Sequence, residues 1–326
     1  MIDPNWTCGR YAPSPTGSQH LGNALTALAA WGIARAAGAR FVLRMDDLDT
    51  QRCRPEYDRM VLDELAWLGM EWDEGPDRGG PHAPYRQSQR SEQYQAALQR
   101  LTEAGRTAQC WLSRKDLSEL ASAPHGHPQP YGPQEREASD AVSKQRQADG
   151  MAPAVRFRLN GERRTVQDRL RGARTVDLEA ELGDPVLYRR DGMYGYQLAT
   201  VIDDHQMGVD HVVRGHDLWG DAALQATVGE VLGAREPAWV HLPLVVDSEG
   251  TRLSKRRGDW TLEALRARGA SAALIRGWVA KQLGLTPTAD ALSSTALIAS
   301  FSQATRIKTG DIILSANDVA QMIKPE

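Results

Sequence analysis

The sequence predicts an α/β fold in which a parallel, doubly wound sheet is divided by a long insertion. Two stretches, within residues 9–68 and 194–232, alternate short apolar runs with helix-length runs. This order is typical of parallel sheets, because consecutive parallel strands need a crossover helix. The roughly 100 residues between the two stretches lack the pattern, so we expect them to form a separate α/β unit.

We expect the first half of the sheet within residues 1–80. A short apolar strand runs into a turn at 9–23 that is broken by prolines and glycines, and an Ala- and Leu-rich helix follows to about Ala37. Residues 40–45 form a second strand. A helix over 55–68 comes next, opened by a proline and ended by a glycine.

The insertion is expected to cover residues 81–190. Residues 91–120 favour helix, whereas 122–150 contain four prolines and three glycines and favour a mobile loop with a short helix near its end. The run 154–159 alternates like a half-buried strand. Its predicted partners are two short apolar runs, 165–166 and 186–190.

Residues 191–260 are expected to complete the sheet, and 261–326 to form a helical C-terminal segment without a further globular domain. The predicted elements of this second half are a helix over 196–204, a buried strand at 211–215, a helix over 218–232 and a hairpin between 242 and 254.

Composition indicates an ordinary globular protein, with 25% charged and 41% hydrophobic residues. No apolar run approaches the ~20 residues that span a bilayer, and no signal peptide is evident, so we expect a cytoplasmic monomer without membrane contact. The three cysteines are too scattered for a disulfide framework. The net charge of −3 is unevenly distributed, since residues 46–78 carry 11 acids and 4 bases but residues 251–281 carry 8 bases and 2 acids. Such polarity suits a protein that holds RNA on one side.

The turn at residues 9–23 has the features of a phosphate-binding site. Gly17 and Gly22 let the backbone approach a ligand closely, and His20 adds a donor beside them. The helix that follows directs free N–H groups and its positive dipole end at the same place. The stretch therefore predicts an anion cradle at the end of the first strand.

Two motifs carry a resemblance to a known family. Arg10-Tyr-Ala-Pro-Ser-Pro-Thr-Gly followed by His20-Leu-Gly-Asn resembles the HIGH-type signature of class I aminoacyl-tRNA synthetases, in the form of the glutamyl group. Residues 252–256, Arg-Leu-Ser-Lys-Arg, resemble the matching KMSKS-type loop. Their order and their separation of about 230 residues make the combination specific. The resemblance implies a Rossmann-type catalytic domain that activates an amino acid with ATP and Mg²⁺.

The resemblance also implies roles for individual residues. His20 and Lys255 take the catalytic positions of the two motifs and contact phosphate groups. The residues implied in ATP binding are His20, Gly22, Asn23, Arg252, Ser254 and Lys255. Positioning and charge neutralisation suffice for this chemistry, because the carboxylate of the substrate is itself the nucleophile.

Glutamate is the amino acid that the resemblance implies. An arginine is the natural partner of its carboxylate and an acid that of its amine. The positions that match the family pattern are Arg10, Ala12, Ser14, Asp46, Tyr196 and Arg214. The family usually has Glu where this chain has Asp46, and the shorter side chain reaches an ammonium group directly or through a water.

A zinc site that is common in this family is degenerate here. Its Cys-x-Cys and Tyr-x-x-x-Cys pattern corresponds to Cys110, Leu112, Tyr131 and Glu135, so two cysteines are replaced. Structural zinc is held mainly by nitrogen and sulfur ligands. We therefore expect no zinc, and a segment 110–135 that is held by packing or is mobile.

The short region after the second motif narrows the resemblance further. Glutamyl-tRNA synthetases continue into an anticodon-binding domain, for which the last 40 or so residues leave no room. The chain thus resembles the glutamyl-Q tRNA(Asp) synthetases, which glutamylate queuosine at the wobble position of tRNA(Asp), and glutamate, ATP and queuosine-containing tRNA(Asp) are the implied partners. Two alternatives remain: a truncated glutamyl-tRNA synthetase that charges the tRNA 3′ end, and a non-catalytic tRNA-binding paralogue. The nucleotidyltransferases share only the first motif and are the least favoured class.

Overall fold

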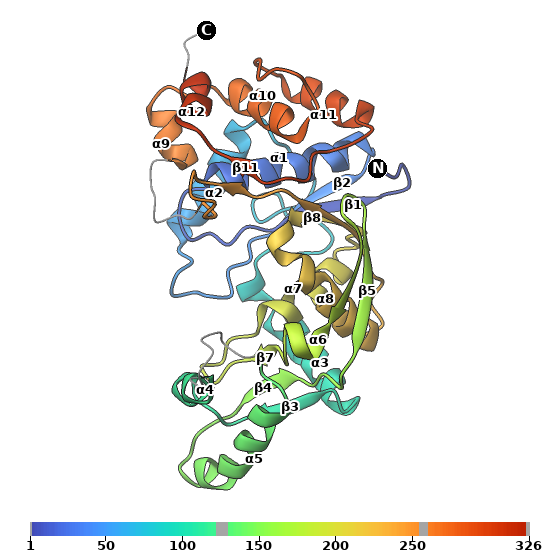
Figure 1. Cartoon of the computed structure of the whole chain (residues 1–326), viewed down its shortest axis with the longest axis vertical. Coiled ribbons are helices and arrows are strands. Elements are labelled where there is room, and N and C mark those ends of the chain that lie inside the picture. The colour runs from blue at the N-terminus through green and yellow to red at the C-terminus, as the bar shows by residue number, and fades with distance from the viewer. Residues whose placement is uncertain (1, 122–129, 254–259, 324–326) are drawn as a thin grey trace.

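The computed structural model describes residues 2–121, 130–253 and 260–323 (Figure 1). The molecule is elongated, with the C-terminal helices at one end and the insertion at the other. Within the described ranges, no helix has both the length and the apolarity that a bilayer crossing requires.

Parallel strands form the centre of the molecule, as the sequence predicted. Strands β1 (Cys8–Tyr11) and β2 (Arg40–Leu43) pair in parallel, and β8 (His211–Gly215) pairs in parallel with β9 (Ala238–Leu242). The two pairs adjoin, because the backbone N–H of Asp210 donates to the carbonyl oxygen of Cys8 at 3.0 Å. Segments about 200 residues apart in the sequence therefore lie side by side, although the β1-β2 pair and the β8-β9 pair belong to separate hydrogen-bonded sheets.

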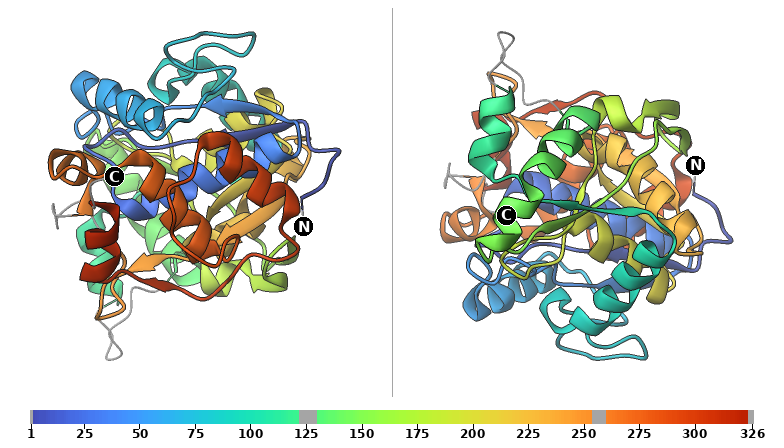
Figure 2. Two further views of the ribbon diagram at one scale, coloured as in Figure 1. Left: turned by 90° about the horizontal axis from the view of Figure 1, so that it is seen from above. Right: turned by 90° about the horizontal axis from the view of Figure 1, so that it is seen from below.

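Helix α1 (Leu21–Ala36) is the central helix beside these strands. It is apolar on all sides, and 11 of its residues are buried, as expected for a helix covered on every face. The C-terminal helices lie over it (Figure 2). A Cβ atom on Gly32 would lie 2.4 Å from the ring of Phe301, so glycine is required for this close contact with α11.

The other helices of the catalytic lobe agree with the predicted ranges to within a few residues. They are α2 (Pro55–Trp67), α7 (Tyr196–Gln206) and α8 (Trp219–Val231).

The insertion contains more regular structure than the sequence predicted. Its described elements are α3 (Ser91–Glu103), β3 (Thr107–Cys110), α4 (Arg114–Ala121), α5 (Pro133–Ala148), β4 (Ala154–Phe157), α6 (Leu178–Glu181) and β7 (Val186–Tyr188). Strands β3, β4 and β7 form an antiparallel sheet. The expectation of a loop with only a short helix was wrong for the described part of 122–150, because α5 occupies 16 residues.

The predicted partner of β4 at residues 165–166 was also wrong. These residues belong to β5 (Arg163–Asp168), which pairs in an antiparallel hairpin with β6 (Gly172–Asp177). Strand β5 then joins β9 in parallel, through Asp168 opposite Trp239. The hairpin thus extends the catalytic sheet, in the order β6-β5-β9-β8.

The C-terminal segment is mainly helical, as predicted. Its helices are α9 (Leu262–Ala267), α10 (Ala272–Leu283), α11 (Ser294–Gln303) and α12 (Ala316–Met322). It also contains a short strand, β11 (Ile312–Ile313), which pairs in parallel with β10 (Val245–Val246). The predicted hairpin between 242 and 254 is confirmed for the described residues. Val246 and Arg252 form an antiparallel bridge, and the backbone N–H groups of Asp247 and Leu253 donate to the carbonyl oxygens of Thr251 and Val245 at 2.9 and 3.2 Å.

Candidate active site

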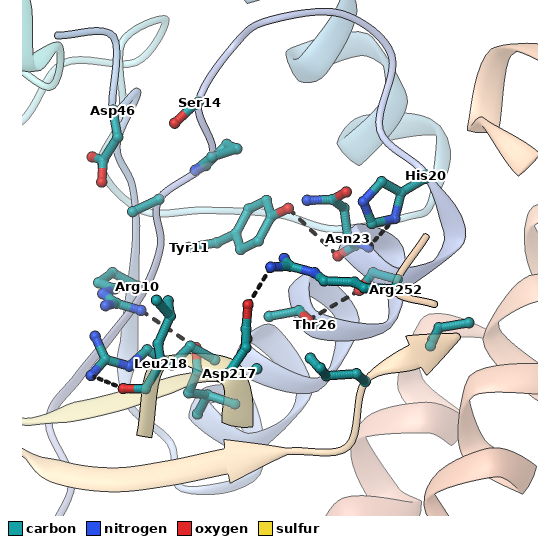
Figure 3. Close-up of a pocket in the computed structure, with 18 of the residues that line it drawn as sticks. Arg10, Tyr11, Ser14, His20, Asn23, Thr26, Asp46, Asp217, Leu218 and Arg252 are labelled. Carbon is teal, nitrogen blue, oxygen red and sulfur yellow. Dashed lines mark hydrogen bonds and ion pairs between the residues drawn. The ribbon is translucent and has the colours of Figure 1, made fainter. Parts of the chain in front are cut away.

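A cavity of about 370 Å³ opens where β1 and β8 end (Figure 3). Ten of the twelve predicted site residues line it: Arg10, Ala12, Ser14, His20, Gly22, Asn23, Asp46, Tyr196, Arg214 and Arg252. The other two, Ser254 and Lys255, lie outside the described residues. The carboxyl end of a parallel sheet is the expected place for such a cavity.

One end of the cavity is formed by the N-terminus of α1. His20 is the N-cap residue, and its Nδ1 accepts a hydrogen bond from the backbone N–H of Asn23 at 3.2 Å. Because Nδ1 accepts, the neutral ring carries its hydrogen on Nε2. His20 is therefore oriented as a donor beside the positive end of a helix, which suits a phosphate oxygen.

Arg252 reaches the same end of the cavity from the root of the KMSKS-type loop. Its guanidinium forms an ion pair with the carboxylate of Asp217, which follows β8 (Figure 3). The Arg252 side chain is 57% exposed, so this contact contributes little to stability. An exposed arginine can exchange such a carboxylate contact for an anionic ligand.

A buried group of charges lies at the other end. Arg44 is fully buried, and its guanidinium contacts Asp46 and Asp204 at 2.7 Å each. Arg10 binds Asp204 from the other side, with Nε 3.3 Å from Oδ1. Asp203 also contacts Arg44, with its Oδ2 3.5 Å from Arg44 Nε.

Burial and charge act in opposite directions on the acids. Burial raises the pKa of Asp46 to about 6, although Arg44 opposes the shift. Burial would also raise the pKa of Asp204, but Arg10 and Arg44 together hold it below its usual value. Asp204 thus remains a carboxylate near neutral pH, whereas Asp46 gains or loses its proton close to physiological pH.

Arg214, at the end of β8, is a buried cation held by neutral groups. It donates to His241 Nε2 (3.1 Å), Gln225 Oε1 (2.8 Å) and the carbonyl oxygen of Leu218 (3.0 Å). Burial lowers the pKa of its guanidinium. Within the described ranges it forms no ion pair with a carboxylate, and a buried cation in this situation favours an anionic ligand.

Tyr196 lies at the same part of the cavity and is 38% exposed. It is the first residue of α7, after the N-cap Gly195. A Cβ atom on Gly195 would lie 1.9 Å from the carbonyl oxygen of Val186, so only glycine lets the chain pass there. This close approach sets where α7 begins and hence where Tyr196 lies.

Sequence reasoning missed Arg44, Asp204 and Asp217 as members of the site. Arg44 precedes Asp46 by two residues at the end of the second strand, which was a usable signal. Asp204 is the last residue of the helix predicted over 196–204. Its contact with Arg44 joins residues 160 positions apart, and no local pattern reports such a distance.

The residues at the degenerate zinc positions pack against their neighbours. Cys110, Leu112 and Tyr131 form a small buried cluster, and the guanidinium of Arg156 lies 4.0 Å from the centre of the Tyr131 ring. Glu135 instead caps α5 by accepting from the backbone N–H of Gly132 at 2.8 Å. Throughout the described ranges, no three His, Cys, Asp or Glu side chains are placed to hold a metal ion.

Comparison with known proteins gives consistent matches. The family model described as "tRNA synthetases class I (E and Q), catalytic domain" matches residues 8–311. The glutamyl-Q tRNA(Asp) synthetase of Symbiobacterium thermophilum is 43% identical over 318 residues, which are 97% of this chain and 98% of that protein. The glutamate–tRNA ligase 2 of Acidithiobacillus ferrooxidans is 42% identical over 83% of this chain and 57% of that protein. A solved structure, the glutamate–tRNA synthetase from Elizabethkingia anophelis, matches with a TM-score of 0.84 and 27% identity, over 97% of this chain and 69% of that one.

Proposed function

Because the chain belongs to the family of class I tRNA synthetases for glutamate and glutamine, we propose that it activates L-glutamate with ATP and transfers the glutamyl group to queuosine in tRNA(Asp). The family makes the chain a ligase of the aminoacyl-tRNA synthetase type, and class I synthetases use ATP with Mg²⁺. The observation that carries the finer proposal is the match along 98% of a glutamyl-Q tRNA(Asp) synthetase at 43% identity.

In the first step, an α-carboxylate oxygen of glutamate attacks the α-phosphorus of ATP. The bond between the α-phosphorus and the bridging oxygen breaks, and pyrophosphate leaves. Mg²⁺, when bound to the phosphates, would neutralise part of their charge. His20 donates from Nε2 to a phosphate oxygen, beside the N-terminus of α1. Arg252 supplies positive charge after leaving Asp217. Lys255, which lies outside the described residues, is the second cation that the family motif implies. Both act by stabilising charge that moves onto the leaving group.

Glutamate is bound by groups at the opposite end of the cavity. Arg214 pairs with the side-chain carboxylate, and Tyr196 lies beside it. The ammonium group is held by the carboxylate of Asp46, while Arg10 and Ser14 bind near the reacting carboxylate. Arg10 is fixed by Asp204, which limits its movement during the reaction.

In the second step, a hydroxyl group of the acceptor attacks the carbonyl carbon of the glutamyl-adenylate. A new ester bond forms, the hydroxyl proton is released, and AMP leaves. In queuosine the attacking group is a hydroxyl of its cyclopentene ring, so the anticodon itself has to approach the cavity.

Transfer of labelled glutamate to defined tRNAs tests this proposal. We expect label on queuosine-containing tRNA(Asp), retained when the terminal adenosine is replaced by 2′,3′-dideoxyadenosine and lost when guanosine replaces queuosine. Nuclease cleavage in both arms of the tRNA should leave the label on the anticodon fragment. Label that depends on queuosine and tolerates the blocked 3′ end would establish base modification.

A second candidate is a glutamate–tRNA ligase, favoured by the 42% identity to the Acidithiobacillus protein. This activity would place label on tRNA(Glu), and the dideoxy terminus would abolish it. Such a result would overturn the queuosine proposal and leave glutamate activation intact. Absence of glutamate-dependent ATP–pyrophosphate exchange, with either tRNA present, would overturn both.

A further inference from the structure

Arg214 is held differently from the other buried arginines near the cavity. Arg10 is paired with Asp204, Arg44 with Asp46 and Asp204, and Arg90 with Asp203 at 2.6 Å. Among the residues that the structure describes, Arg214 donates to an imidazole nitrogen, an amide oxygen and a backbone carbonyl oxygen. All three fix the guanidinium in place, and none of them carries a negative charge.

The imidazole acceptor is itself oriented by a carboxylate. His241 lies opposite Arg214 in the register of β8 and β9, and its side chain is fully buried. An arginine Nε can only donate, so His241 Nε2 accepts and the ring hydrogen lies on Nδ1, 2.7 Å from Asp168 Oδ2. Asp168 is fixed in turn by the backbone N–H groups of Leu170, Arg171 and His241. The carboxylate of Asp168 is thus separated from Arg214 by the imidazole ring of His241.

The amide acceptor is also anchored. Gln225 of α8 is buried, and its Nε2 donates to Gln197 Oε1 at 2.9 Å, which directs its Oε1 at Arg214. Trp239 also lies beside it, with the Arg214 guanidinium 4.9 Å from its ring centre. The charge of Asp221, also on α8, acts to raise the pKa of Arg214, but among the described residues the two form no ion pair. A glutamate at position 225 would have nearly the same shape and would neutralise Arg214, and the chain has glutamine there.

We propose that His241 and Gln225 are specificity-determining positioning residues, which hold Arg214 rigidly while leaving its charge for a substrate carboxylate. The inference rests on the proposed glutamate activation and deepens it. A guanidinium already paired with a carboxylate would gain little from a second one, and glutamine would then bind almost as well as glutamate. Neutral acceptors avoid this, so the cavity selects an amino acid with a negatively charged side chain over its amide.

The decisive variant is Gln225→Glu, assayed by ATP–pyrophosphate exchange with glutamate and with glutamine, in the presence of queuosine-containing tRNA(Asp). We expect KM for glutamate to rise by about 50-fold, as for the loss of one charge-assisted interaction, with kcat changed by less than about threefold. KM for glutamine should change by less than about threefold, so the preference for glutamate falls.

Two further variants separate charge from structure. Gln206→Glu is the matched control, because Gln206 Oε1 also accepts from an arginine, Arg90 (2.6 Å), but does not line the cavity. It should leave both KM values unchanged. Gln225→Met removes the acceptor without adding charge, and its KM for glutamate should remain at least about fivefold below that of Gln225→Glu. Thermal unfolding of each variant checks that it is folded.

His241→Phe provides an independent measurement if Gln225→Glu does not fold. It keeps an aromatic ring beside Trp239 but removes the acceptor of Arg214 Nε, so KM for glutamate should rise about tenfold. A KM for glutamate within a factor of three of the native value in Gln225→Glu, or in His241→Phe when the former is unfolded, would overturn the inference. An equal rise in Gln225→Met and Gln225→Glu would do the same. If the native chain shows no glutamate-dependent ATP–pyrophosphate exchange, that result contradicts the proposed function itself and is distinguishable from a failure of the present inference.

Discussion

The hydroxyl group of Ser18 donates to the carboxylate of Glu64, and its oxygen accepts from the backbone N–H of Glu263 at 3.2 Å. The other oxygen of Glu64 accepts from the backbone N–H of Gln19 at 2.9 Å, and the carbonyl of Gln19 accepts from Leu262 at 2.7 Å. One buried acid on α2 therefore joins the HIGH-type turn to the residues that follow the KMSKS-type loop.

Replacing Glu64 with Gln should loosen this connection. An amide has one acceptor oxygen, so one of the bonds to Ser18 and Gln19 is lost. We expect kcat for ATP–pyrophosphate exchange to fall by about tenfold, with KM for glutamate changed by less than threefold, and stability to drop by about 1–2 kcal/mol. Exchange kinetics and urea unfolding measure the two effects. Asp63→Asn, at the exposed neighbouring position, is the control, and equal effects in both variants would refute the connection.

Glutamate binding should depend on pH through Asp46. Burial raises the pKa of Asp46 from 3.8 to about 6. Asp46 therefore stabilises the folded, ligand-free protein at pH values below ~4, and this stabilisation is lost as the pH rises through about 6. Only the carboxylate form attracts the substrate ammonium. KM for glutamate should therefore rise by up to about tenfold per unit as the pH falls below 6.

Measurement of KM from pH 5 to pH 8 checks this expectation, with Asp46→Asn as the reference. The variant should bind glutamate more weakly and show a flatter pH dependence over this range. A native KM that is constant between pH 5 and pH 7 would show that Asp46 does not hold the ammonium group.

Arg44 should be essential for stability, because it is fully buried between Asp46 and Asp204. Arg44→Met would leave the buried carboxylates of Asp46, Asp203 and Asp204 close together without this cation and should cost about 3–5 kcal/mol of unfolding free energy. Urea denaturation measures this loss. Arg52→Met, at an exposed position, should change stability by less than about 0.5 kcal/mol. A loss below about 1 kcal/mol for Arg44→Met would contradict the assigned role.

The native chain should bind zinc weakly or not at all. Elemental analysis after dialysis is expected to find less than about 0.1 zinc per chain, and EDTA should leave the thermal midpoint unchanged. Restoring the two missing thiols in Leu112→Cys/Glu135→Cys should raise zinc content towards about one per chain. Stoichiometric zinc in the native protein would show that other side chains replace the lost cysteines.

Much of the catalytic lobe could be predicted because its signals are local. The apolar runs around β1 and β8 and the capped helix α1 each lie within a short window of sequence. Ten of the twelve candidate residues line one cavity, and seven of these come from the two motifs: Arg10, Ala12, Ser14, His20, Gly22, Asn23 and Arg252. By contrast, the pairing of β5 with β6 and β9 depends on contacts that alternation does not specify.

The length of helix α5 was underestimated, because only a short helix was predicted near the end of residues 122–150 and the surroundings of α5 are mainly solvent. Of its residues, only Ser139 is fully buried, so no apolar stripe marks it. The start signals were present, since Pro133 is at the first turn and Glu135 caps the N-terminus. The four prolines of the region obscured them, because proline also marks loops.

The hydrogen bond from Asp210 to Cys8 has a consequence for the newly made chain. On the ribosome, β1 and β2 emerge long before β8 and β9, and β1 then has no neighbour on one edge. The cavity requires Arg10 and Arg214 together, so a nascent chain can bind glutamate only after about 240 residues have left the exit tunnel. Until then an apolar strand edge stays open to chaperones and to other chains, and the speed at which the insertion is translated sets how long that exposure lasts.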